Sequence, residues 1–246
     1  MQRFFTIFWR ELRGYYVTPV VYVFATIFAL LTGLLTFIVG GYFQRGEANL
    51  SGPFFSWIPL LMALFAPAIG MRIWADENRQ GTLDLLFSHP IRLSSLIFAK
   101  FLAALAALCT ALAITLSFVF TTSYLGEPDY NVIATSYLGA ILIGASFVAI
   151  SCACSAASRN QVIAFVVSAT LCLLFVLIGT ERLSNEVVNL FPGSSALVDS
   201  ITTLAIGTHY EGFRKGFIET RSLIYFLTFI GTGLFINYAT VVKKQG

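Results

Sequence analysis

The residues with the clearest capacity for chemistry lie in a charged stretch, residues 72–90, between two long apolar runs. Its acidic residues, its central arginine and its turn-forming pair are Asp76, Glu77, Arg79, Gly81, Thr82 and Asp84. Charged groups of this kind form charge-assisted hydrogen bonds with a partner surface. The stretch is therefore a candidate contact site for another protein. A solvated loop between two helices is the alternative interpretation.

Other kinds of site find little support in the sequence. There is no P-loop, so the chain does not bind ATP by that route. His89 and His209 stand alone, without the neighbours that a zinc site needs. The cysteines lie in apolar runs without CxxC spacing, which favours small buried residues over a disulfide or metal site. We predict no metal and no cofactor in this chain.

The composition indicates that the chain is solvated by lipid. Of its 246 residues, 57% are hydrophobic and only 11% are charged, whereas an ordinary soluble domain has about 25% charged residues. Its mean hydropathy is +0.82. A net charge of +3 is too small to suggest a nucleic-acid partner.

Apolar runs long enough to cross a bilayer core, which takes about 20 residues, recur along the chain. We predict an all-α polytopic membrane protein that forms one domain, residues 1–246, with six transmembrane helices. The predicted spans are residues 19–43, 53–74, 95–122, 132–157, 161–179 and 222–242.

Three segments outside the spans have predicted structures. Residues 1–18 form an amphipathic helix with Arg3, Arg10 and Arg13 opposite an aromatic face, which suits the membrane interface. A stub continuous with the first span is the alternative. In residues 76–89 we expect a helix that ends near Arg79, a turn at Gly81 and a short second helix. Residues 180–221 are predicted to form short extracytoplasmic or re-entrant helices.

Alanines recur at every fourth position in the third and fourth predicted spans. Small residues at this spacing let membrane helices approach closely, so we predict helix–helix contacts there. The alanines are Ala99, Ala103, Ala107, Ala111, Ala145, Ala149 and Ala153.

The distribution of basic residues predicts the orientation. Six spans place both termini on one side, and that side carries ten of the 15 Lys and Arg residues. By the positive-inside rule this side is cytoplasmic. The ten are Arg3, Arg10, Arg13, Arg72, Arg79, Arg92, Lys100, Arg159, Lys243 and Lys244.

The predicted spans contain no acidic residue or histidine at depth. Ion-coupled carriers usually need ionisable groups there, so their absence argues against a carrier or a charged-ring channel. Arg72 and Lys100 lie near the cytoplasmic ends, where their side chains are expected to snorkel to water.

Three segments together resemble the ABC-2 permease family. Residues 77–86 read ENRQGTLDLL and precede Ser88-His89-Pro90, and this pattern is similar to the family signature of an acidic residue, Gly-Thr and a Leu-rich turn before Pro. Residues 158–165, SRNQVIAF, resemble the family's loop between spans four and five. Residues 209–226 resemble the segment before the last span in the gliding-motility and nitrous-oxide-reductase-maturation branch.

The resemblance implies a membrane subunit that dimerises with a second permease subunit and recruits a separate ABC ATPase, which would hold ATP and Mg²⁺. A periplasmic accessory protein is a further implied partner. The segment between spans two and three would be the coupling helix, with Asp76, Glu77, Arg79, Gly81, Thr82 and Asp84 at the contact. Arg159 and Asn160 would form a second cytoplasmic contact, and residues 1–18 would be the connecting helix.

By this resemblance, the expected function is that of a non-enzymatic permease subunit of an exporter in the bacterial inner membrane. A membrane anchor that transmits force without transporting cargo is the alternative. A stand-alone channel or carrier is a third possibility, against which the lack of buried charge in the spans argues. The substrate does not follow from the resemblance.

Overall fold

The computed structural model describes residues 2–45, 49–81, 92–178 and 203–244, and these are helical without any strand. The N-terminal half contains α1 Gln2–Val17, α2 Val20–Leu34, a π-helical turn Leu35–Val39, α3 Tyr42–Arg45, a 3₁₀ turn Phe55–Trp57, α4 Ile58–Gly70 and α5 Arg72–Gln80. The C-terminal half contains α7 Leu93–Ile114, α8 Leu116–Leu125, α9 Tyr130–Ala157, α10 Gln161–Leu177, α13 Ile206–Arg214 and α14 Thr220–Lys243.

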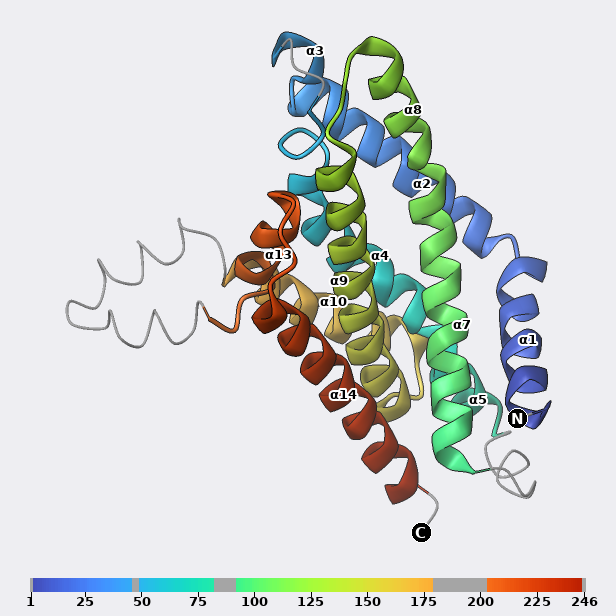
Figure 1. Ribbon diagram of the computed structural model, residues 1–246. Coiled ribbons are helices and arrows are strands. Elements are labelled where there is room, and N and C mark those ends of the chain that lie inside the picture. Colours follow the sequence, from blue (N-terminus) through green and yellow to red (C-terminus); the bar gives the residue numbers. More distant parts are fainter. Residues whose placement is uncertain (1, 46–48, 82–91, 179–202, 245–246) are drawn as a thin grey trace.

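The bundle is built around α9, which contacts α4, α5, α7, α10, α13 and α14 (Figure 1). The most apolar stretch of α9 is 72% buried, and that of the continuous helix Phe55–Arg79 is 78% buried. The corresponding stretches of α2 and α14 are only 22% buried. The two inner helices therefore form the core, and the outer helices leave apolar faces free for lipid.

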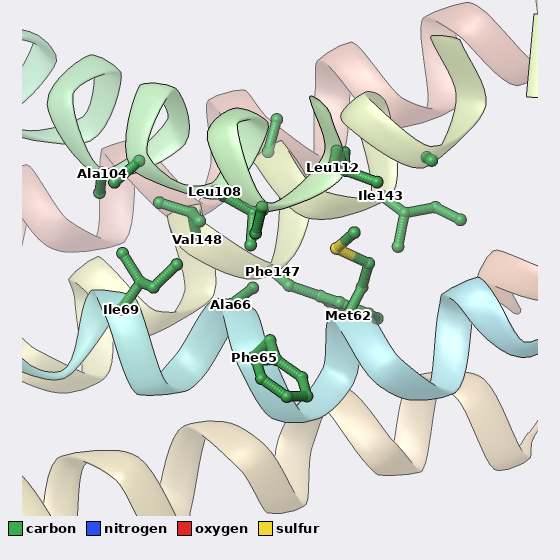
Figure 2. Packing of buried hydrophobic residues seen from close by; sticks show 14 of the residues in the cluster. Met62, Phe65, Ala66, Ile69, Ala104, Leu108, Leu112, Ile143, Phe147 and Val148 are labelled. Carbon is green, nitrogen blue, oxygen red and sulfur yellow. The ribbon is translucent and has the colours of Figure 1, made fainter. Parts of the chain in front are cut away.

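The centre of the bundle is a three-helix contact between α4, α7 and α9. Figure 2 shows Met62 and Ala66 of α4, Leu108 of α7, and Phe147 and Val148 of α9 gathered between the three helices. All five side chains are essentially inaccessible to solvent. Lipid tails are as apolar as the helix surfaces, so the hydrophobic effect does not drive helices together inside a membrane. Close packing of this kind holds them together instead.

The helices approach one another most closely at glycines, where there is no side chain to keep them apart. A Cβ added at Gly70 of α4 would lie 2.3 Å from Ser151 Cβ of α9, and one at Gly144 of α9 would lie 2.5 Å from Leu108 Cδ2 of α7. Gly233 of α14 abuts Ala149 in the same way, at 2.9 Å from its Cβ. The alanines named above are buried, except Ala153, which is half-buried.

Five helical stretches in the described residues are long and apolar enough to cross a membrane. The predicted fifth span, residues 161–179, corresponds to α10, which has 17 residues and falls short of that length. The predicted third span is divided at Thr115, where α7 ends and α8 begins. Thr115 Oγ1 lies 3.0 Å from Tyr137 Oη of α9 and 2.6 Å from the carbonyl of Leu112, which holds this break against the core.

The segment predicted as residues 180–221 contains α13 in its described part, and residues 179–202 lie outside the described ranges. α13 packs on α9 through its apolar face. Thr135 Oγ1 donates to the Phe213 carbonyl at 2.8 Å, and Tyr210 Oη donates to the Ser136 carbonyl at 3.3 Å. These contacts attach α13 directly to the central helix.

Candidate coupling site

One end of the bundle collects the charged segments that are far apart in the sequence. The start of α1, the end of α14 and helix α5 lie together at the lower end of Figure 1. The α9–α10 link lies there too, because its backbone bonds directly to α5. This end is the candidate site, and its geometry depends on how α5 is held.

Helix α5 is capped by a side chain from α9. Ser155 Oγ accepts hydrogen bonds from the backbone N–H groups of Trp74 at 3.0 Å and Ala75 at 3.1 Å, and it donates to the Met71 carbonyl at 2.8 Å. The first N–H groups of a helix lack partners within the helix, so a capping oxygen stabilises its start. Here the cap comes from another helix, and it fixes the α4–α5 junction to α9.

A buried lysine joins three helices at this end. Lys100 of α7 is 3% exposed, and its Nζ lies 2.8 Å from Glu77 Oε1 of α5 and 3.2 Å from Glu11 Oε2 of α1. The same Nζ donates to the Ile73 carbonyl at 3.2 Å and lies 5.1 Å from the centre of the Trp74 ring. We call Glu11, Lys100 and Glu77 the buried triad.

The triad corrects the expectation that Lys100 snorkels to water. Its ammonium group turns inward, where two carboxylates, a carbonyl and an aromatic face replace its hydration. Burial alone would raise the pKa of Glu11, but Lys100 and Arg10 outweigh burial and lower it. Glu77 Oε2 is buried without a hydrogen-bond partner among the described residues.

The other face of α5 is bonded to the α9–α10 link. The Asn78 side chain donates to the Ser158 carbonyl at 2.8 Å. The Gln161 side chain donates to Asp76, which also lies 3.7 Å from Arg72 and 4.0 Å from Arg79. α5 is thus held on both sides, by the buried triad and by the α9–α10 link.

The end of α5 is more open. Gly81 adopts a left-handed conformation with φ +67°, and its N–H donates to the Glu77 carbonyl. Glycine suits this position because other residues rarely adopt positive φ. The turn is where the sequence predicts it. Arg79 and Gly81 are exposed, whereas Thr82 and Asp84 lie outside the described residues.

The structure therefore divides the predicted contact residues into two groups. Asp76 and Glu77 are bonded within the chain, whereas Gly81 is exposed and Arg79, which lies 4.0 Å from Asp76, keeps an exposed side chain that can meet a partner. Asn160 caps α10 by accepting from the Val162 N–H at 2.9 Å, and Arg159 is exposed beside it. Of the three arginines predicted on one side of α1, Arg10 and Arg13 are exposed; the side chain of Arg3 is not described.

Sequence reasoning missed Glu11, Ser155 and the inward direction of Lys100. One signal was available: Lys100 is the only charged residue in α7 and α8. A lone charge in an apolar helix implies an internal partner. The partners themselves lie 89 and 23 residues away, so their identity depends on the fold.

The fold and this charged end define a multi-pass helical membrane protein. The family model described as ABC-2 family transporter protein matches residues 6–242. A comparison with curated proteins gave no match. The chain belongs to the ABC-2 family of transporter proteins, and its place in that family is the membrane-embedded permease component of an ABC transporter. Membership supports the resemblance noted above at the family level.

Proposed function

We propose that the chain is the permease subunit of an ABC exporter and that a separate ATPase drives it through the α5 end of the bundle. The observation that carries this proposal is the double attachment of α5, by Ser155 to α9 and by the buried triad to α1 and α7. A push on the exposed Arg79–Gly81 end would reach the three-helix core without an intervening flexible joint.

The proposal includes an orientation and an assembly. The α5 end would face the cytoplasm of the bacterial inner membrane, which the excess of basic residues on that side supports. Two permease subunits, alike or different, would pair in the membrane. ATP and Mg²⁺ would bind in the ATPase. The gliding-motility and nitrous-oxide-reductase-maturation branch remains the proposed branch, on the resemblance of residues 209–226.

Affinity purification in mild detergent, followed by mass spectrometry, tests the proposal. The wild-type chain is expected to retain a P-loop ATPase. The Arg79→Glu variant should retain it several-fold less, because the exposed cation of α5 would become an anion. Arg221→Glu changes an exposed cation at the start of α14, far from α5, and should retain the ATPase normally.

The outcomes separate the candidate functions. Failure of the wild-type chain to retain any ATPase, together with solute flux from the chain alone, would establish a stand-alone channel or carrier. An ATPase complex that hydrolyses ATP without moving cargo, and that supports an envelope machine, would establish the anchor function. If both variants retained the ATPase as well as the wild-type chain does, the ATPase would contact a surface other than α5.

A further inference from the structure

An apolar groove lies along the outside of the bundle between α10 and α14, with α9 as its floor. Its volume is about 720 Å³, which falls within the range of small-molecule sites. Two small residues of the floor, Ala153 and Ala157, and Gly233 of α14 leave room for the groove. The groove is lined from Tyr225 to Thr240 of α14, roughly 22 Å at the helical rise.

Unpaired cations surround the end of the groove that lies near the α5 end of the bundle. Arg159 follows Ser158 of the groove lining, and Lys244 follows Thr240 by one helical turn. Lys243 is exposed beside them. None of the three has a carboxylate within 4.0 Å among the described residues, whereas Arg72 and Lys100 at the same end do.

Lys244 is held in place at this end of the groove. Its Nζ donates to the Ala156 carbonyl at 2.6 Å and lies 3.3 Å from Asn78 Oδ1. Partial burial and the neighbouring charge of Arg159 both lower its pKa. An anion near these two side chains would relieve their repulsion.

We propose that this groove binds one anionic phospholipid, with an acyl chain along α14 and the headgroup phosphate at Arg159, Lys243 and Lys244. The two parts of such a lipid match the two parts of the groove in chemistry. The long apolar channel accepts a hydrocarbon chain, and the cations at its end accept a phosphate. The roughly 22 Å length exceeds half of the about 30 Å bilayer core, so a chain entering from one leaflet fits within it.

A second copy of this chain is a poorer occupant. Two copies in one membrane share the same orientation, and a two-fold axis through the groove would place the same cations of both copies at one depth. The three unpaired cations of each copy would then face each other, which is unfavourable.

Native mass spectrometry in an equimolar mixture of phosphatidylglycerol and phosphatidylcholine tests the proposal. The wild-type chain should retain phosphatidylglycerol preferentially. Arg159→Gln with Lys243→Gln should lower that preference about tenfold or more, because each cation near a headgroup contributes to binding. Ala153→Phe fills the groove and should lower retention of phosphatidylglycerol with the cations intact.

The matched control is Arg13→Gln with Arg92→Gln, two exposed cations away from the groove, which should keep the preference. If the control lost as much of its preference for phosphatidylglycerol, the proposal would be overturned, because any basic surface would then attract the lipid equally well. Normal retention in Ala153→Phe would overturn it too, because the groove would then not hold the chain. So would a disulfide between two copies carrying Ile236→Cys, since the groove would be a subunit interface.

Discussion

At the scale of single residues, Lys100 has the largest structural consequence. It is buried, and it satisfies carboxylates on two other helices at 2.8 Å and 3.2 Å. Removing charged groups from water costs free energy, and only well-placed ion pairs and hydrogen bonds offset that cost. The triad is therefore a specific joint between α1, α5 and α7, and removing Lys100 leaves Glu77 without a counter-charge among the described residues and Glu11 with Arg10 alone.

Lys100→Met tests the joint. The substitution should destabilise the fold by about 3–5 kcal/mol, because Glu77 would remain partly buried without its cation and Glu11 would keep only the exposed Arg10. Thermal unfolding in lipid nanodiscs measures the change. Adding Glu11→Gln and Glu77→Gln should restore most of the lost stability. A melting temperature equal to wild type for Lys100→Met alone would contradict the joint.

The triad also predicts that the stability of the fold depends on pH. The pKa of Glu11 is lowered from 4.5 in the folded state, so its contribution to stability is complete above that value and is lost as the pH falls below it. The difference in melting temperature between wild type and Glu11→Gln should therefore stay constant above pH 4.5 and shrink below it. If the difference in melting temperature grew as the pH fell, the pKa of Glu11 would be raised on folding, which would contradict the prediction.

At the scale of elements, the contact between α4 and α9 sets the position of α5. Gly70 meets Ser151 one turn before Ser155, whose hydroxyl caps α5. The two helices can approach this closely only because position 70 has no side chain. The spacing of α4 and α9 and the cap on α5 are thus parts of one contact.

Gly70→Ala should separate these helices. The added Cβ would lie 2.3 Å from Ser151 Cβ, so the backbones must shift, at a cost of about 1–3 kcal/mol. Gly231→Ala in α14 is the matched control, because nothing lies within 4 Å of its Cβ. Thermal unfolding should show a loss only for Gly70→Ala, and Ser151→Gly should recover part of it. Equal stability of both alanine variants would contradict the close approach.

The sequence predicted the helical class and the turn at Gly81, because apolar run length and turn chemistry are local properties. It did not predict the break at Thr115, where the side chain contacts Tyr137 of another helix. Nor could it pair Lys100 with Glu11, since that contact spans 89 residues.

At the scale of the whole molecule, the bundle has two largely buried inner helices and outer helices that leave apolar faces exposed. The continuous helix through α4 and α5 passes through the core and ends at the exposed Arg79–Gly81 turn. α9 receives the contacts of both halves of the chain. An ATPase bound at the α5 end would therefore act on a helix that passes through the most buried part of the fold.

Site-directed cross-linking shows directly whether an ATPase docks at the α5 end. The native cysteines Cys109, Cys152, Cys154 and Cys172 would first be replaced with alanine. Single cysteines would then be placed by Arg79→Cys, at the α5 end, and by Tyr124→Cys, which is 92% exposed on α8 at the opposite end.

In native membranes, a bifunctional reagent should link the cysteine at position 79 to a P-loop ATPase and leave the one at position 124 unlinked to it. This asymmetry is expected because the start of α1, the end of α14 and the exposed turn all lie at the α5 end. An ATPase cross-link from position 124 with none from position 79 would contradict it.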